Sequence, residues 1–204
     1  MKKILVFTIA VFLFTTEICS AENYRFRLGA GSSSIHTSFE GKQYKNGSFL
    51  ITGIDIIDVE KDDKKKDISY SLLGLKLALE NESLAPGLRC SLGFKGVGGS
   101  IDSGATKEGE FGAIAFMGSM AYIFPGIPSP IPIEISIKLY FSPTPLSFSD
   151  SDRYIESEVG IAFYLIENAS LYLSYRDYNI HMDNDDGKWK VKDDVLGFGL
   201  TLIF

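Results

Sequence analysis

Charged residues that alternate with apolar ones carry most of the chemistry available to this sequence. Eight of them stand next to large apolar residues in short alternating segments: Lys76, Arg89, Lys95, Glu134, Lys138, Glu156, Glu158 and Arg176. Successive side chains of an extended chain point to opposite faces, so these charges would share the face opposite to the apolar one. Charges held away from bulk water have to be paired. The set therefore predicts a network of ion pairs or, alternatively, a charged lining that tunes ion passage through a narrow channel.

A lipid-modifying hydrolase is the enzymatic alternative, and it needs a nucleophile, a base and an orienting group within reach of one another. The sequence has two histidines, His36 and His181. Ser174 precedes His181 by seven residues, roughly 20 Å or more along an extended strand, so it cannot be the partner of that histidine. A serine from another strand stays open. We expect both histidines in loops or at a rim, and we predict no catalytic residue and no enzymatic activity.

The acidic stretch 182–194, MDNDDGKWKVKDD, invites comparison with calcium-binding loops. With Gly187 as the turn glycine, the first ligand position holds Met182 and the twelfth holds Asp193, so the EF-hand pattern fails. We predict a solvated acidic loop, with a weak divalent-ion site as the alternative, and neither a metal nor a cofactor.

Strands have to position these side chains, because period-two alternation recurs along the chain and helical periodicity is poor. Strands are expected near residues 23–31, 33–41, 49–59, 73–79, 88–95, 111–124, 131–141, 155–165, 171–178 and 195–204. The breaks alternate in length. Short ones fall at 81–87, 125–130 and 165–169, and long polar ones at 60–67, 98–109, 142–153 and 181–194. This pattern is typical of an all-β, closed antiparallel transmembrane β-barrel. A barrel with both chain ends in the periplasm has an even strand count, so we predict about ten strands, with eight as the alternative.

The first 21 residues have the features of a cleaved secretory signal peptide. Lys2 and Lys3 precede an apolar run at 4–14, and the small-residue site Cys19-Ser20-Ala21 follows. An uncleaved anchor is the alternative. Without Lys2, Lys3 and Glu17, residues 22–204 hold 18 basic and 25 acidic side chains, a net charge of −7, which argues against nucleic acid as a partner. Cys90 would be the single remaining cysteine, so no internal disulfide can form. We expect 22–204 to be one domain exported by a Gram-negative bacterium.

The apolar faces decide between a soluble and a membrane-spanning barrel. A periplasmic sandwich or lipocalin-like barrel would also alternate, with its apolar face inside. Small and polar residues opposite the apolar ones favour the membrane, as do aromatic residues near strand ends, which resemble interfacial girdles: Tyr24, Phe124, Phe141, Tyr154, Phe163, Tyr164 and Phe204.

The last segment, VLGFGLTLIF, carries one apolar face: Leu196, Phe198, Leu200, Leu202 and Phe204. We expect lipid to cover this face and the last strand to pair with the first, which leaves no open edge. The segment is also similar to the C-terminal signal that the outer-membrane barrel assembly machinery reads.

Three segments of the chain carry a family resemblance: residues 140–180 (YFSPTPLSFSDSDRYIESEVGIAFYLIENASLYLSYRDYNI), the closing GFGLTLIF and the early NGSFLITGIDIIDVEKDDKKKD. These segments resemble the YfaZ-like outer-membrane proteins. This resemblance implies a small barrel in the cell outer membrane and carries no catalytic residue with it. We expect an integral outer-membrane protein that is structural or a narrow, weakly conducting channel. A surface-loop adhesin or receptor is the alternative. Outer-membrane lipid and, during biogenesis, the barrel assembly machinery are the expected partners of a monomer.

Overall fold

The computed structural model describes residues 23–63, 66–104, 107–124, 131–184 and 187–204. The predicted signal peptide at 1–21 and the predicted break at 125–130 lie outside the described residues.

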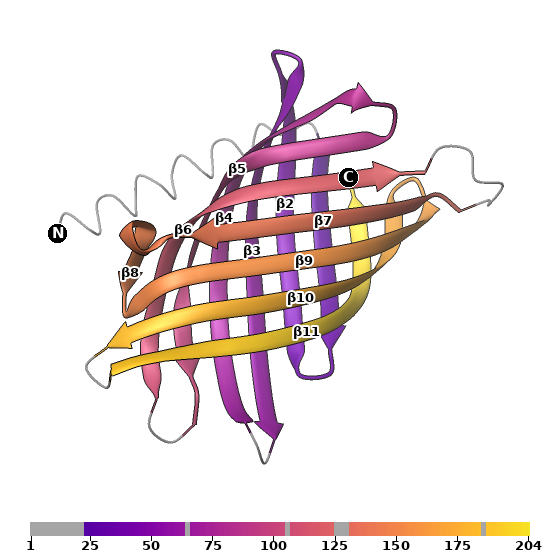
Figure 1. Cartoon of the computed structure of the whole chain (residues 1–204). Coiled ribbons are helices and arrows are strands. Elements are labelled where there is room, and N and C mark those ends of the chain that lie inside the picture. Colours follow the sequence, from indigo (N-terminus) through magenta and orange to yellow (C-terminus); the bar gives the residue numbers. More distant parts are fainter. Residues whose placement is uncertain (1–22, 64–65, 105–106, 125–130, 185–186) are drawn as a thin grey trace.

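One antiparallel sheet contains all the strands of the described chain, and it closes on itself (Figure 1). Its barrel strands are β1 (Asn23–Gly31), β2 (Ser34–Lys45), β3 (Ser48–Asp63), β4 (Lys66–Ala85), β5 (Leu88–Asp102), β6 (Glu108–Ile123), β7 (Ile133–Ser142), β9 (Ser151–Ile166), β10 (Ala169–Asn184) and β11 (Gly187–Ile203). Helix η1 (Thr144–Leu146) and the short strand β8 (Ser147–Ser149) connect β7 to β9. The prediction of an all-β, closed antiparallel barrel with ten strands is confirmed, and the alternative of eight is wrong. No helix in the described part of the chain has the length and apolar character needed to span a membrane.

Two strand pairings close the barrel. Strand β5 pairs with β6, and β1 pairs with β11 in a register that sets Leu28 opposite Leu200. The backbones of Tyr24 and Phe204 exchange two hydrogen bonds, of 3.1 and 2.9 Å. Both described chain ends therefore lie at one end of the barrel, called here the terminal end, and the opposite end, with the tips of the β3–β4, β5–β6 and β10–β11 hairpins, is the hairpin end.

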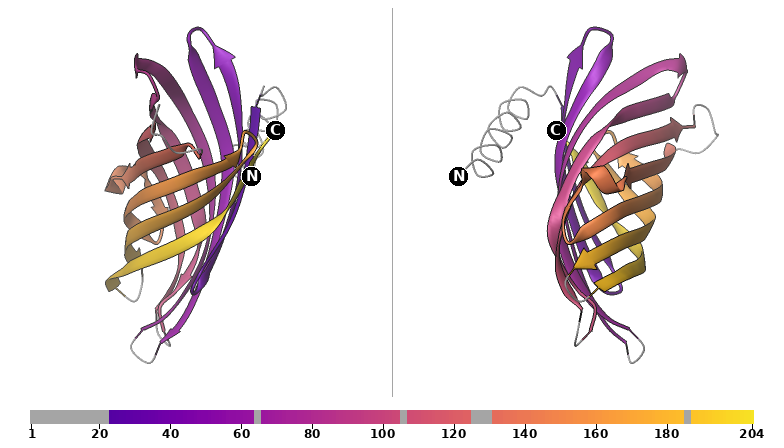
Figure 2. Two further views of the ribbon diagram at one scale, coloured as in Figure 1. Left: turned by 90° about the vertical axis from the view of Figure 1, so that its right-hand side faces the viewer. Right: turned by 60° about the vertical axis from the view of Figure 1, so that its left-hand side comes forward.

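The barrel is sharply bent rather than round. In Figures 1 and 2, strands β2 to β4 run along one wall while β9 to β11 cross the other wall at a steep angle. Glycine permits close strand contacts: a Cβ on Gly93 would lie 2.1 Å from the Leu77 carbonyl oxygen, and one on Gly199 would lie 2.1 Å from that of Leu28. Glycine inside a strand commonly marks such a bend or a close backbone approach.

The faces of the strands exchange character part-way along the barrel. On the outward face of β10, Leu171, Leu173 and Tyr175 are followed by Asp177, Asn179, His181 and Asp183. On its inward face, Ser170, Tyr172, Ser174 and Arg176 are followed by Tyr178, Ile180 and Met182. The terminal half is thus apolar outside and polar inside, whereas the hairpin half is polar outside and apolar inside.

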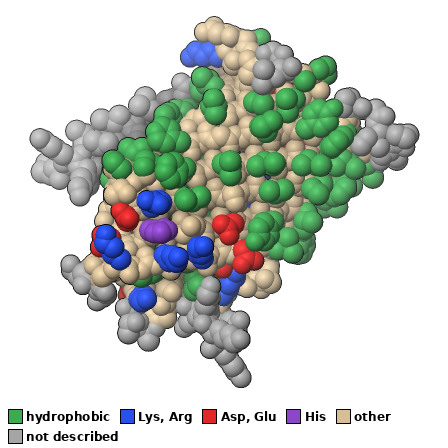
Figure 3. All heavy atoms as spheres, in the orientation of Figure 1, with side chains coloured by type: hydrophobic (Ala, Val, Ile, Leu, Met, Phe, Trp, Pro, Cys, Tyr) green, Lys and Arg blue, Asp and Glu red, His purple; other side chains and the backbone are tan. Residues whose placement is uncertain are grey.

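The exchange happens at the same level on many strands. Residues that face each other in register mark it: Asp58, Ser71, Ser100 and Glu110 on β3 to β6, and Ser157, Asp177 and Asp194 on β9 to β11. We call this set the boundary row. Between the boundary row and the terminal end, large apolar side chains cover the outside, for example Leu173, Phe198 and Leu139, which are 45%, 67% and 57% exposed. Figure 3 shows this apolar belt next to a group of charged side chains.

The long polar loops predicted at 60–67, 98–109 and 181–194 are wrong. Strands β3 and β4, β5 and β6, and β10 and β11 continue through most of these segments. The outward residues of these strand segments lie beyond the apolar belt and are polar. Polar segments of this kind are typical of loops, and this explains the wrong prediction. The break at 142–153 does hold irregular structure, since it contains η1 and β8.

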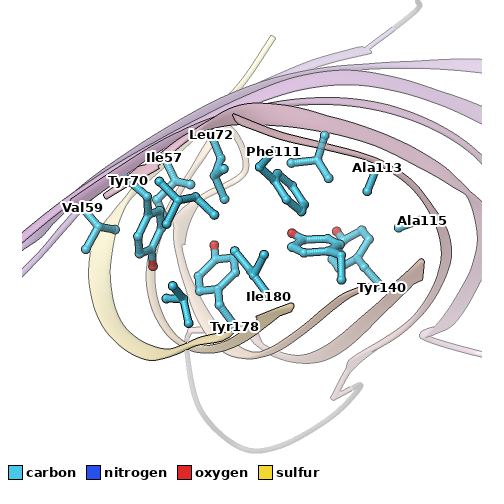
Figure 4. Packing of buried hydrophobic residues seen from close by; sticks show 14 of the residues in the cluster. Ile57, Val59, Tyr70, Leu72, Phe111, Ala113, Ala115, Tyr140, Tyr178 and Ile180 are labelled. Carbon is cyan, nitrogen blue, oxygen red and sulfur yellow. The ribbon is translucent and has the colours of Figure 1, made fainter. Parts of the chain in front are cut away.

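The inward face of the hairpin half is a hydrophobic core. Its members come from both walls of the barrel: Ile57, Val59, Ile68, Tyr70, Leu72, Ile101, Phe111, Tyr154, Tyr178, Ile180, Met182, Trp189 and Val191. Figure 4 shows several of these side chains pointing toward one another across the barrel. The burial of this apolar surface stabilises the hairpin half.

Candidate functional site

The structure places all eight charged residues predicted for the lumen on the inward face. Seven of them are buried: Lys76, Arg89, Lys95, Glu134, Glu156, Glu158 and Arg176. The eighth, Lys138, has a side chain that is 16% exposed. They occupy the middle and the terminal half of the barrel, directly below the hydrophobic core.

Glu158 is the centre of the middle layer. Residues Lys138, Glu158 and Arg176 face one another in register across β7, β9 and β10. The Glu158 carboxylate accepts from Lys138 Nζ at 2.9 Å and lies 2.8 Å from Arg176 Nη2. Arg27 Nη1 approaches it at 3.5 Å. One carboxylate is thus the shared acidic partner of three cations. This arrangement of charges is stable only while the carboxylate is present.

Two lysines face each other in the same layer, Lys76 on β4 and Lys95 on β5. Like charges directly opposite destabilise a sheet unless acidic groups compensate them. Lys76 donates to Glu40. Lys95 Nζ lies 2.8 Å from Glu156 and 3.1 Å from Asp55, so each lysine has its own acidic partner.

A second group of ion pairs lies near the terminal end. Arg89 pairs with Glu134, which also accepts from the Tyr164 hydroxyl at 2.6 Å. Lys42 pairs with Glu80. These pairs come from strand ends, so they line the opening of the barrel at its terminal end.

Several members of the network do not appear among the predicted lumen residues: Arg27, Glu40, Lys42, Asp55 and Glu80. Their position relative to the apolar residues could have revealed them, because Arg27 stands between Phe26 and Leu28 in the same way that Arg176 stands beside Tyr175. Strands β1 and β2, which hold Arg27, Glu40 and Lys42, carry few large apolar residues, and the alternation is therefore weaker there.

The expectation for His36 is wrong. Its ring lies inside the barrel on β2, with its two nitrogens 3.2 and 3.3 Å from Arg176 Nη2, because position 36 has the inward parity of Ser38 and Glu40. His181 faces outward near the hairpin end, whereas Ser174 faces inward on the same strand, so the two cannot meet. Two aromatic residues predicted for the girdle also face inward, since Tyr154 donates to Glu156 and Tyr164 to Glu134.

Little open space remains among these side chains. The cavity at the terminal end, called here the terminal chamber, has about 40 Å³ of room for the centres of water-sized molecules, and the middle layer has about 10 Å³. A single water needs roughly 10–15 Å³ on this measure. In the parts of the chain that are described, no three His, Cys, Asp or Glu side chains form a metal-binding group.

A closed barrel with an apolar belt outside and paired charges inside has the arrangement of a membrane-spanning β-barrel. Among solved structures, the fold is similar to the KdgM porin, with 5% identity, a TM-score of 0.40, and coverage of 89% of this chain and 99% of the porin. It is also similar to the outer membrane channel DcaP of Acinetobacter baumannii (10% identity, TM-score 0.36, 89% and 62% covered). A third structure is the anion-selective porin from Comamonas acidovorans (9% identity, TM-score 0.33, 85% and 51% covered).

No protein-family profile matches the chain, so the resemblance to the YfaZ-like proteins stays a prediction. No curated protein matches it either. At TM-scores below 0.5, the three likenesses say nothing about activity, and the type of barrel rests on the faces of this chain.

Proposed function

We propose that this chain is an integral outer-membrane β-barrel whose terminal half lies in the bilayer and whose hairpin half projects from it. The exchange of faces at the boundary row carries the proposal. Lipid covers the apolar belt below that row, and water covers the polar outer face above it. On β11 the belt runs from Leu196 to the chain end, which is close to the 9–11 residues that a tilted strand needs to cross a bilayer.

The lumen favours a structural barrel over an open channel. Ions that enter from the terminal end would meet the charged middle layer first and the hydrophobic core above it. Buried side chains at both levels leave no room for a hydrated ion to pass without a rearrangement. The charge network therefore holds the walls of the membrane half together, and any conduction is weak.

Fractionation and electrophoresis test the location. We expect the protein in the outer-membrane fraction, with a band that shifts on boiling because a closed barrel resists detergent. Planar-bilayer recording of the same material then tests the lumen, and we expect no steps or only small ones. A soluble protein without a heat shift would overturn the membrane location. Large, stable conductance steps would leave the location intact and overturn the sealed lumen.

Leu173→Arg tests the belt directly. Leu173 lies in the middle of the outward apolar face of β10, so a membrane barrel should lose about 2–4 kcal/mol of stability in lipid vesicles. Ser69→Arg is the matched control, because Ser69 faces outward beyond the boundary row, opposite Glu60 and Asp102. We expect this control to unfold like the wild type. Equal stability of the two variants would contradict lipid coverage of Leu173.

A surface-binding role is the second candidate, and the length of the hairpins favours it. Strand β4 has 20 residues and β3 has 16, more than a bilayer crossing needs, so the β3–β4 hairpin projects well beyond the belt. We propose no hydrolytic role: His36 is committed to Arg176 and His181 faces away from the lumen. Loss of adhesion after shortening the β3–β4 hairpin, with the heat shift retained, would support the surface role.

A further inference from the structure

The terminal chamber has an excess of positive charge. Six basic side chains line it: Arg25, Arg27, Lys42, Lys76, Arg89 and Lys138. Three acidic side chains face them: Glu40, Glu80 and Glu134. Each of these carboxylates already has a basic partner, in Lys76, Lys42 and Arg89 respectively. Adding the neighbouring Glu158 does not remove the excess, since that carboxylate also binds Arg176.

The unmatched charge is centred on β1. Among the described residues, Arg25 has no carboxylate within 4 Å. The nearby Arg27 reaches Glu158 only at 3.5 Å. The Nε atoms of Arg27 and Arg89 are buried and have no hydrogen-bond partner in the described chain. A guanidinium that lines an enclosed space without a carboxylate partner is costly, and an anion bound to Arg25 in the chamber would relieve that cost.

We propose that the terminal chamber binds a small oxyanion of the phosphate, sulfate or carboxylate class, held by Arg25 and Arg27 on one side and by Arg89 on the other. The size of the space fits such a ligand, because room for about three water molecules is also room for one tetrahedral oxyanion. A lipid headgroup with its glycerol would not fit. Arg25 and Lys42 lie at the terminal end and are partly exposed, so a soluble anion can reach the chamber.

This anion site goes beyond the proposed function. It requires a closed, folded barrel, but it does not require that the barrel conducts ions. It also contrasts with the net charge of the whole chain, which is −6. Nonspecific attraction of anions to the protein surface would be weak, and any saturable binding would report this chamber.

The test titrates the refolded full-length barrel in neutral detergent with inorganic phosphate at constant ionic strength, balanced with chloride. Binding is read from the unfolding temperature and from the ³¹P line width. We expect a saturable rise in unfolding temperature and a broadened ³¹P line. Arg25→Gln should weaken binding about tenfold, the effect of losing one charge-assisted contact, and it leaves no carboxylate unpaired. The exposed Lys188→Gln is the matched control and should bind as the wild type does.

A second variant supplies the missing negative charge within the chain. Ser119 lies opposite Lys138 and lines the chamber, so Ser119→Glu should abolish phosphate binding while the heat-shifted band is retained. Absence of saturable binding by the wild type, or equal binding by Arg25→Gln, would overturn the site. Because the heat shift and membrane fractionation are read on the same preparations, the membrane location can stand when the anion site fails.

Discussion

At the scale of single residues, Glu158 is the side chain on which most of the interior depends. Its carboxylate is 3% exposed and contacts Lys138, Arg176 and Arg27. A buried ion pair adds little compared with apolar residues of the same size, but removal of one partner leaves the others uncompensated. Here the removal of one carboxylate would expose three cations to that penalty.

We predict that Glu158→Gln lowers the free energy of unfolding by about 3–5 kcal/mol, measured as the shift of the urea midpoint in detergent. Asp183→Asn serves as the control, because Asp183 pairs with Lys188 at an exposed position and exposed pairs contribute little. This control should leave the midpoint unchanged. A Glu158→Gln midpoint equal to that of the wild type would show that the three cations do not depend on Glu158.

His181 gives a pH-dependent signal outside the membrane half. Burial lowers the pKa of this histidine below its ordinary value of 6.5, and the cations Arg153, Lys190 and Lys192 lower it further, while Asp152 raises it. Since the folded pKa lies below the unfolded one, protonation favours unfolding. Stability present above pH 6.5 is therefore lost as the pH falls toward the folded pKa.

We predict that an NMR titration of the His181 ring protons gives a pKa below 6.5, and that Lys190→Gln raises it because position 190 faces His181 across β10 and β11. Lys45→Gln, at the far end of the barrel, should leave it unchanged. Titration of the wild-type ring at or above 6.5 would contradict the cationic surroundings.

At the scale of elements, period-two alternation predicted the ten strands well, and β1 has the predicted bounds. On the hairpin side, the predicted strands are shorter than the observed ones. Alternation continues through Val59, Tyr70 and Ile180, but with the apolar residues on the opposite face. A pattern search that expects the apolar residues of a strand to keep one phase stops where the outer face changes from apolar to polar, and the predicted strands end there.

The network residues illustrate the same limit. The sequence predicted that the eight charged residues face inward, because the side of a strand on which a residue lies follows from its position in the local alternation. It could not give the pairings across the barrel, such as Lys95 with Asp55 and Glu156, since these depend on the bend and shear of the closed sheet. His36 was misplaced because the second strand lacks a continuous apolar face.

Gly93 tests the bend of the sheet. A Cβ at this position would lie 2.1 Å from the Leu77 carbonyl oxygen and 2.5 Å from Ala78 Cα, and neither backbone can rotate away. We predict that Gly93→Ala lowers stability by about 1–3 kcal/mol, the usual cost of overpacking, measured by urea unfolding. Gly96→Ala on the same strand is the control, because its nearest contact would be 4.0 Å away. A neutral Gly93→Ala would mean that β4 and β5 can separate without cost.

At the scale of the whole molecule, two kinds of side chain fill the barrel at two levels. Ion pairs fill the terminal half, whose outer face is apolar, and a hydrophobic core fills the hairpin half, whose outer face is polar. Each half thus buries the kind of side chain that its surroundings exclude from the outer face. The two halves meet at the boundary row, and one continuous hydrogen-bonded sheet spans both.

A variant at the chain end can distinguish an effect on folding from an effect on assembly in the cell. Phe204 has a 67% exposed side chain, and its contribution to closure comes from backbone hydrogen bonds with Tyr24, which Phe204→Ala keeps. We therefore predict that this variant refolds in detergent with a loss of roughly 1 kcal/mol or less. If the last segment is the signal for the assembly machinery, the heat-shifted band in the outer-membrane fraction of cells should fall several-fold.

Leu165→Ala is the matched control for Phe204→Ala, because Leu165 is a 50% exposed apolar residue near the same end of the barrel but on β9. Its outer-membrane yield should equal that of the wild type. Equal yields of both variants would remove Phe204 from the assembly signal. Equal losses in cells and in refolding would instead assign its side chain to stability, because a signal read only during assembly cannot change the unfolding of a finished barrel.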